Sequence, residues 1–236
     1  MTSNVTQPLD LVYMIKEDED NEELRYSLRS LKNLPHRKVF FAGYKPSWVK
    51  NVEHIAVEQT GNKYDNIARN FIEICKCTDI SDDFILMNDD FFIIKKIAHV
   101  PNLRRLKPLK HYAKLYDNNK DKTYQSTLLH AVEFIKRLGL KDIDSYEMHA
   151  PMVINRVKCL KLISMYPEVN TQHRRSNYGN YYQIGGKRMK DVKVVRDGMD
   201  FSKDIPFLST IDNVFDGSEV GRFIMGKFTK KCEYER

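Results

Sequence analysis

Two adjacent acids stand inside one of the most apolar stretches of the chain. The stretch is FILMNDDFFII, residues 84–94, and its polar members are Asn88, Asp89 and Asp90. Burying a carboxylate without a partner costs free energy, and two neighbouring carboxylates also repel each other. Carboxylate oxygens suit Mg²⁺ and Mn²⁺, which stabilise the charge that develops on phosphates. We interpret Asp89 and Asp90 as ligands for Mg²⁺ or Mn²⁺; the alternative is a turn in which Asp89 caps a helix and Asp90 faces solvent.

The first half of the chain alternates apolar runs with amphipathic segments. Strands are predicted at 9–15, 38–44, 52–58 and 84–88, and helices at 21–34 and 64–77. Asp20 followed by Glu23 resembles a capping box at the start of the first helix. This order predicts an α/β fold with a mostly parallel sheet flanked by helices. Ligands bind at the carboxyl ends of strands in such sheets, which is where the two acids fall.

The second half is less regular. Helices are predicted at 123–140 and 150–167, the segment 174–186 is rich in turn formers, and an apolar run within 205–217 leads to Asp212 and Asn213. A basic segment at about 100–125 interleaves tyrosines with arginines and lysines, a pattern that suits a nucleic-acid strand or a loop over an active site. We expect one catalytic domain over 1–236, with this segment as a mobile basic insertion.

Composition narrows the class of protein. Lys and Arg number 39 against 32 Asp and Glu, giving a net charge of +7, which favours polyanionic partners or serves solubility alone. No apolar run approaches the length of a membrane span and no secretory leader is visible, so we expect no membrane span and a cytoplasmic location. The four cysteines lack the spacing of a zinc or disulfide framework.

Four segments in order carry a family resemblance. DLVYMIK, NEELRYSLRSLKNL, VFFAGYKPSWV and FILMNDDFFI resemble the first two conserved regions of the Stealth family of hexose-phosphate transferases. The family pattern there is a DVVYTWV strand, an ELRYSLRS helix, a P-S-W turn and an NDD strand end. MHAPMVINRVKCLKLISMYPEVNTQHRRS and PFLSTIDNVFDGSEVGRFIMGKFTKKCEYE resemble its third and fourth regions. The chain differs in having Asp212 before Asn213, where the family has Asn before Asp.

The resemblance implies a fold similar to the GT-A type of nucleotide-diphospho-sugar transferases, and with it a set of roles. It implies a nucleotide-sugar donor, taken as UDP-linked, and a divalent cation. By this resemblance we assign catalysis to His149, Asp90 and Asp212, and the metal to Asp89 and Asp90. We assign substrate binding to a larger set, comprising Tyr13, Arg25, Arg29, Asn66, Asn70, Asn88, Arg174, Arg175 and Asn213.

Several alternatives stay open. The transferred group is a hexosyl-1-phosphate or a hexosyl unit, and the acceptor a polyanion such as modified DNA or a surface polymer. His149 acts as a general base or only caps the helix predicted after it, and Arg174 and Arg175 clamp phosphate or are solvated surface charge. A protein of another class, a nucleic-acid-binding module that has lost catalysis, has the same basic surface.

Overall fold

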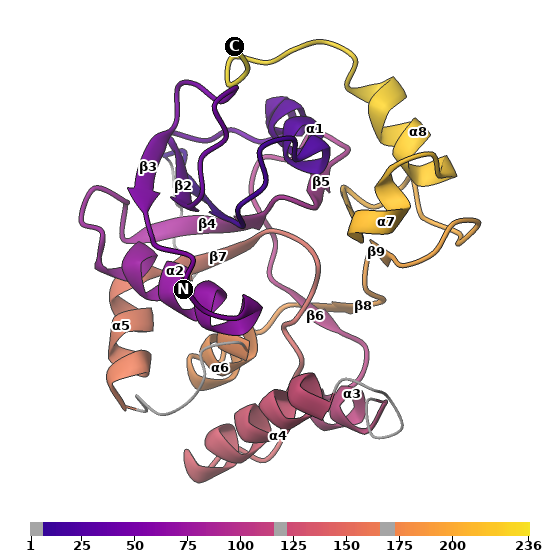
Figure 1. The fold of residues 1–236 in the computed structure, drawn as a ribbon. Coiled ribbons are helices and arrows are strands. Elements are labelled where there is room, and N and C mark those ends of the chain that lie inside the picture. The colour runs from indigo at the N-terminus through magenta and orange to yellow at the C-terminus, as the bar shows by residue number, and fades with distance from the viewer. Residues whose placement is uncertain (1–6, 116–121, 166–172) are drawn as a thin grey trace.

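The core of the fold is a five-stranded sheet in the order β3-β2-β1-β4-β7 (Figure 1). The structure is a computed structural model and describes residues 7–115, 122–165 and 173–236. The strands are β1 (Asp10–Ile15), β2 (Val39–Gly43), β3 (Glu53–Ala56), β4 (Asp83–Asn88) and β7 (Met152–Asn155). The first four are parallel and β7 is antiparallel to β4. The predicted α/β class with a mostly parallel central sheet is confirmed.

Different helices cover the two faces of this sheet. Val12 of β1 packs on the side of α2 (Lys63–Lys76) and α5 (Arg156–Met165). Its neighbours Leu11 and Tyr13 pack on the other side with α1 (Glu22–Ser30). Successive side chains of a strand point to opposite faces, so one strand contributes to both cores. Because both of their faces are covered, β1, β2 and β4 read as continuous apolar runs, whereas β3 is mostly exposed.

A second, smaller sheet begins directly after the two acids. Asp89 and Asp90 form the turn between β4 and β5 (Phe91–Ile93). Strand β5 pairs with β10 (Phe207–Thr210), which also pairs with β9 (Lys193–Val194). Helices α7 (Asp212–Phe215) and α8 (Glu219–Lys227) pack on this sheet around Phe92 and Leu208. The acidic turn therefore joins the two sheets.

The basic segment predicted as an insertion has regular structure within the described residues. It contains β6 (Leu103–Arg105), α3 (Leu109–Leu115) and the start of α4 (Lys122–Arg137), while 116–121 lie outside the described residues. Strand β6 pairs with β8 (Lys187–Met189). Leu109 and Ala113 of α3 are fully buried, which ties the helix to the core. The mobility of the segment stays a prediction.

Two predicted elements of the second half are wrong. Residues 150–167 do not form one helix, because Met152–Asn155 pair with β4 as strand β7 and only then does α5 begin. The gain from extending the sheet outweighs the helical spacing of the apolar residues. The segment 174–186 is more regular than predicted, since it opens with helix α6 (Arg174–Tyr181), which packs against α4.

The cap of α1 also differs from the prediction. Asn21, rather than Asp20, is the N-cap, and its Oδ1 accepts a hydrogen bond from Leu24 N at 3.0 Å. Glu23 does not complete a capping box with Asp20, because the helix begins one residue later than predicted. Its carboxylate instead accepts a hydrogen bond from Thr210 Oγ1 on β10. The helix ends in a 3₁₀ turn, η1 (Leu31–Asn33).

Within the described ranges, every helix is too short or too polar to cross a membrane.

Candidate functional site

The carboxyl end of β4 and the amino end of β7 lie at the same end of the strands of the central sheet. Parallel pairing with β1 sets Met14 beside Asn88, so the acidic turn follows the carboxyl end of β4. Antiparallel pairing sets Met152 beside Leu86, and the chain that enters β7 therefore passes the same end. His149 lies three residues before Met152. The topology thus brings residues some sixty positions apart in the chain to one end of the sheet.

Asp90 is buried and held from the second sheet. Its Oδ2 accepts hydrogen bonds from Lys193 Nζ of β9 and Ser209 Oγ of β10, both at 3.0 Å. Its Oδ1 is buried without a hydrogen-bond partner among the described residues, and so is the Oδ1 of Asn88. The alternative in which Asp90 faces solvent and Asp89 caps a helix is wrong, because Asp90 is buried and strand β5 follows the turn.

Asp89 is half-buried, with Asp90 beside it. Its Oδ2 accepts a hydrogen bond from Asn21 Nδ2 at 3.0 Å. Burial and the negative charge of Asp90 raise the pKa of the Asp89 carboxyl to about 6, although the Asn21 donor and Lys16 oppose the shift. The two acids therefore share a site in which a further positive charge is favourable.

His149 is paired with an acid that the sequence analysis missed. Its Nδ1 lies 2.7 Å from Asp191 Oδ2, and its backbone N donates to Asp191 Oδ1 at 3.0 Å. Asp191 also accepts a hydrogen bond from Arg105 of β6. Burial raises the pKa of Asp191, but His149 and Arg105 lower it more, so the group is ionised. No described residue hydrogen-bonds to Nε2 of His149, whose side chain is 29% exposed.

The helix predicted directly after His149 does not form. The residues after it form strand β7, so the helix-cap alternative is wrong. The partner that fixes the ring is Asp191. An acid that accepts from one ring nitrogen orients the imidazole and leaves the other nitrogen to exchange protons, as in hydrolase triads.

Arg175 is buried near both Asp90 of the acidic turn and Asp191. Its Nη1 donates to the carbonyls of Met148 and Ala150, at 3.0 and 2.6 Å, and its guanidinium stacks on Phe91 at 5.2 Å. Its Nη2 is buried and has no hydrogen-bond partner in the described part of the chain. Burial lowers the pKa of Arg175, while Glu147, Asp90 and Asp191 raise it. The buried cation thus has a donor left for a ligand.

Arg174 points to the other side of α6. It donates to Met14 Sδ at 3.1 Å and lies over the ring of Phe71 at 4.8 Å, in the core between the sheet and α2. Burial lowers its pKa to about 10, although Glu147 acts in the opposite sense. Both arginines are buried, which makes the solvated-surface alternative wrong. Of the two, Arg175 is nearer the acids.

Three of the proposed substrate-binding residues have structural contacts. Arg29 makes two hydrogen bonds of 2.7 Å to Glu235, and Arg25 reaches the same carboxylate at 3.3 Å while its guanidinium lies 4.1 Å from the centre of the Trp48 ring. Tyr13 is fully buried and its hydroxyl lies 2.9 Å from Ser27 Oγ. Tyr13 and Arg29 are buried with their polar atoms bonded inside the protein, so they do not contact substrate. The substrate-binding role of Arg25, which is partly exposed, stays a prediction.

Two other predicted residues lie on α2 and shape a loop. Asn66 makes hydrogen bonds to both the N–H and the carbonyl of Gly61, at 2.9 and 3.0 Å. Asn70 is buried and accepts from Gln59 Nε2 at 3.1 Å. Gly43, at the end of β2, has φ +101°, and a Cβ there would lie 2.8 Å from Asn70 Nδ2. Asn70 therefore lies beside the carboxyl end of β2.

Asp212 and Asn213 open α7, two and three residues after β10. The preceding residues of β10, Ser209 and Thr210, contact Asp90 and Glu23. Asn213 is exposed. The proposed catalytic role of Asp212 stays a prediction.

Asp191, Arg105 and Lys193 are site residues that were not predicted from the sequence. A signal was present in KDVKVV, where Asp191 and Lys193 alternate with Val192 and Val194. Such alternation is typical of a strand with one polar and one apolar face. The valines are buried, and the two charged side chains bind His149 and Asp90.

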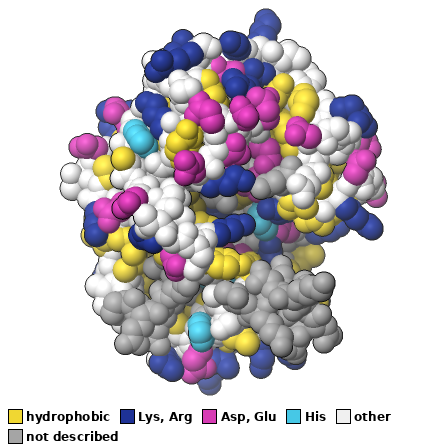
Figure 2. Space-filling model, viewed as in Figure 1, with side chains coloured by type: hydrophobic (Ala, Val, Ile, Leu, Met, Phe, Trp, Pro, Cys, Tyr) yellow, Lys and Arg dark blue, Asp and Glu magenta, His cyan; other side chains and the backbone are white. Residues whose placement is uncertain are grey.

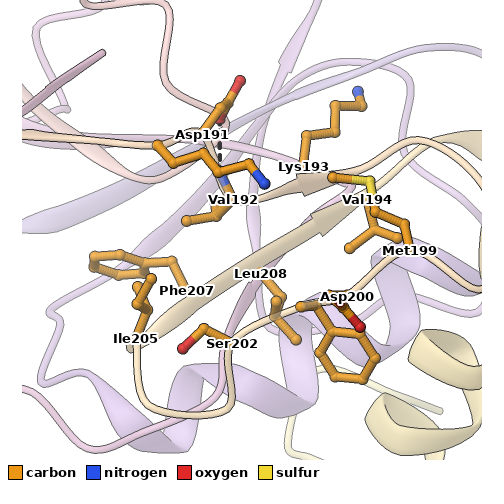
Figure 3. Close-up of a pocket in the computed structure, with 12 residues that line it drawn as sticks. Asp191, Val192, Lys193, Val194, Met199, Asp200, Ser202, Ile205, Phe207 and Leu208 are labelled. Carbon is orange, nitrogen blue, oxygen red and sulfur yellow. Dashed lines mark hydrogen bonds between the residues drawn. The ribbon is translucent and has the colours of Figure 1, made fainter. Parts of the chain in front are cut away.

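Figure 2 shows one face of the molecule, viewed as in Figure 1. A recess crosses this face, with Lys, Arg and His side chains along it and Asp and Glu side chains grouped above it. A pocket of about 330 Å³ lies between β9, β10 and the chain from Met199 to Ile205, and Asp191 and Lys193 are among the residues that line it (Figure 3). Its lining includes Val194, Phe207 and Leu208, while the side chains of Asp191 and Lys193 point away from these apolar residues.

Over the described residues, His, Cys, Asp and Glu nowhere form a group of three that could hold a metal ion. A cation at the acidic turn would therefore depend on two carboxylates, from Asp89 and Asp90, and on oxygens of another kind. The buried Oδ1 of Asn88 is such an oxygen, and like the buried Oδ1 of Asp90 it lacks a donor among the described residues.

Comparison with known proteins gives structural neighbours only. No family model and no curated protein matches the sequence. A crystal structure of an active-site mutant of LgtC is similar over 95% of this chain and 98% of that chain, with 10% identity and a TM-score of 0.48. The glycosyltransferase GlyE of Streptococcus pneumoniae TIGR4 is similar over 94% of this chain and 50% of that chain, with 9% identity and a TM-score of 0.35. At such values the function has to come from the side chains of the site.

Proposed function

We propose that the protein is a transferase that uses a nucleotide-sugar donor and a divalent cation to glycosylate, or glycosyl-phosphorylate, an acceptor hydroxyl. One observation carries this proposal. Among the described residues, Asn88 Oδ1 and Asp90 Oδ1 are buried acceptors without donors, and Arg105 Nε and Arg175 Nη2 are buried donors without acceptors. Arg175 lies over Phe91, the residue after Asp90, and Arg105 is bonded to Asp191. Each such atom costs free energy in the folded chain unless a ligand satisfies it. A cation together with a diphosphate supplies both kinds of partner.

The acidic turn would hold the cation. Asp89, Asp90 and the amide oxygen of Asn88 supply the hard oxygen ligands that Mg²⁺ and Mn²⁺ bind. When bound, such an ion stabilises negative charge on phosphate oxygens and on a leaving nucleotide. Lys193 competes for one oxygen of Asp90, but its Nζ would also neutralise phosphate at the same place.

The arginines would orient the phosphates. Arg175 is fixed by the carbonyls of Met148 and Ala150, so its remaining donor has a set direction. Arg105 is fixed in the same way by Asp191. Guanidinium groups that are already held lose little side-chain entropy when phosphate binds, which makes them effective clamps.

His149 would act on the acceptor. With Nδ1 bound to Asp191, Nε2 can accept the proton of an acceptor hydroxyl as its oxygen attacks the donor. Attack at the anomeric carbon breaks the bond between that carbon and phosphate oxygen, and a nucleoside diphosphate leaves. Attack at the sugar-bound phosphorus breaks the bond between the two phosphates, and a nucleoside monophosphate leaves. The resemblance to the Stealth family favours the second reaction.

The acceptor class is proposed from charge. The chain carries a net charge of +7, which attracts a polyanionic acceptor such as modified DNA or a surface polymer. Electrostatic attraction of this kind weakens as salt concentration rises, so acceptor affinity should fall with ionic strength while affinity for a nucleotide with Mn²⁺ falls less.

The experiment has two arms. The first measures thermal unfolding with UDP and other nucleotides, with and without Mn²⁺, and a rise that needs both ligands supports the site. The second incubates the protein with UDP-sugars and candidate acceptors and identifies the released nucleotide by mass spectrometry. UMP indicates transfer of sugar phosphate and UDP indicates transfer of sugar. Absence of stabilisation by any nucleotide with Mn²⁺ contradicts the proposal.

A further inference from the structure

The start of α1 is bonded to the acidic turn by one side chain. Asn21 is buried, and its amide group makes two hydrogen bonds of 3.0 Å. Oδ1 accepts from Leu24 N and so caps the helix, while Nδ2 donates to Asp89 Oδ2. A single amide therefore joins the helix N-terminus to a carboxylate of the proposed cation site.

Capping alone does not require asparagine here. Asp, Ser and Asn are about equally good N-caps, and Thr is slightly weaker. Only Asn combines a capping oxygen with an –NH₂ donor of this reach, since Asp has no donor and Ser and Thr are shorter. The donor half of Asn21 thus does something that capping does not explain.

Helix α1 is a rigid support for this donor. Along its length, hydroxyls of the helix bond to the strand that follows the acids: Ser27 Oγ donates to Phe91 O at 2.5 Å, and Ser30 Oγ accepts from Ile93 N at 3.0 Å. Just beyond the helix, Asn33 Nδ2 donates to Ile93 O at 2.7 Å. The helix and the turn it contacts therefore share one framework, and the position of Asn21 relative to Asp89 is fixed.

We infer that Asn21 is a positioning residue, whose amide holds the Asp89 carboxylate in the orientation in which it binds a divalent cation. The inference rests on the proposed function, because it requires the cation site at Asp89 and Asp90. Donors that fix a metal-binding carboxylate are worth about 10- to 100-fold in metal affinity when they are removed. Asn21 would thus affect metal binding without touching the metal.

The test measures binding of Mn²⁺ alone to the whole protein, by electron paramagnetic resonance of the free ion. The variants Asn21→Ser and Asn21→Thr keep a capping oxygen and remove the amide donor. We expect a 10- to 100-fold rise in the Mn²⁺ dissociation constant. The thermal midpoint of the metal-free protein should stay close to that of the wild type, which shows that the fold and the cap are intact.

A matched control lies at the start of α2. Asn62 is also an N-cap, and it accepts from Tyr64 N and Asp65 N. Asn62→Ser makes the same chemical change and should leave Mn²⁺ binding unchanged. Wild-type Mn²⁺ affinity in both Asn21 variants overturns the inference and leaves the cation site standing. If the wild-type protein itself binds no Mn²⁺, the inference and the cation part of the proposed function both fall.

Discussion

Two regions of the molecule bury an arginine near a carboxylate, and they differ in whether all polar atoms of these two side chains have hydrogen-bond partners. On helix α1, Arg29 makes two hydrogen bonds to Glu235, and its third guanidinium nitrogen donates to Phe228 O at 3.2 Å. At the edge of the central sheet, Arg175 and Asp90 each retain a buried polar atom without a partner among the described residues. A complete set of partners indicates a structural role, and an incomplete one indicates a place for a ligand.

The largest expected effect is on turnover at the incomplete region. Asp90→Asn keeps the shape of the side chain but removes a proposed cation ligand. We expect turnover to fall roughly a thousandfold, which corresponds to about 4 kcal/mol of lost transition-state stabilisation. Steady-state kinetics with a UDP-sugar donor measure this.

The control for that variant is an exposed acid. Asp204 is 98% exposed and pairs with Lys95 at 3.2 Å on the surface, so Asp204→Asn makes the same change away from the site. It should leave turnover unchanged. Wild-type turnover in Asp90→Asn would show that the atoms without partners have no catalytic meaning.

The next effect separates chemistry from binding. His149→Ala should lower kcat by roughly 10²- to 10⁴-fold, as expected for a general base, and change donor affinity little. Binding of UDP with Mn²⁺, measured by calorimetry, gives the affinity. His130 is exposed on α4, so His130→Ala serves as the matched control. Equal losses in kcat and in affinity would contradict a role as base.

Exchanging each arginine for methionine tests the comparison directly. Arg29→Met leaves the buried Glu235 carboxylate without its main partner, and we expect a loss of about 3–5 kcal/mol in unfolding free energy. Arg175→Met leaves two backbone carbonyls short of a donor but also removes a buried charge. We expect a smaller loss, of about 1–3 kcal/mol. Urea denaturation measures both values.

The response of the thermal midpoint to ligand further distinguishes the same two variants. We expect UDP with Mn²⁺ to raise the thermal midpoints of the wild type and of Arg29→Met, and not to stabilise Arg175→Met. If both variants respond to the ligand equally, Arg175 is as structural as Arg29.

The smallest expected effect is a difference in pH dependence. The pKa of Asp89 is raised to about 6 by burial and by Asp90, so its contribution to stability is full below the unfolded value of 3.8 and is lost as pH rises through 6. Burial raises the pKa of Glu235, but the hydrogen bond from Arg29 lowers it more, to about 2. Its contribution is therefore present above 4.5 and is lost as pH falls toward 2.

Two variants should each remove one of these two changes of unfolding free energy with pH. Asp89→Asn should abolish the decline in stability of the metal-free protein between pH 4 and pH 6. Glu235→Gln should abolish the part of the loss of stability that Glu235 causes as pH falls from 4.5 toward 2. Urea denaturation from about pH 2 to about pH 6 measures both. A variant with the pH profile of the wild type would show that the assigned group does not cause the change.

Local patterns in the sequence predicted most of the first sheet. The strands β1, β2 and β4 and the helices α1 and α2 follow from apolar runs and helical spacing, because each is buried on the faces that its own pattern describes. Strand β3 also follows from its pattern, although most of its residues are exposed. Strand β7 did not follow, since the same residues also show helical spacing and only pairing with β4 decides between the two. Long-range pairing is not visible in a local pattern.

The residues of the candidate site also differ in whether a local sequence pattern could predict them. Asp89, Asp90 and His149 could be found from the motifs around them, whereas their partners Asn21, Lys193 and Asp191 come from distant elements. Asp191 is 42 residues from His149, and Lys193 is 103 residues from Asp90. Nothing in the sequence near one member of such a pair specifies the other, so the partners became visible only in three dimensions.

The pairing of Glu235 with α1 has a consequence for how the protein is made. Glu235 is 206 residues away from Arg29, so the N-terminal helix is synthesised long before its partner exists. At cellular rates the interval is roughly 10 to 40 seconds. During that time the arginine cannot be buried without an unpaired charge, so final docking of α1 must wait until Glu235 has been synthesised. A ribosome stalled before Glu235 would therefore carry a helix α1 that is formed but not yet docked.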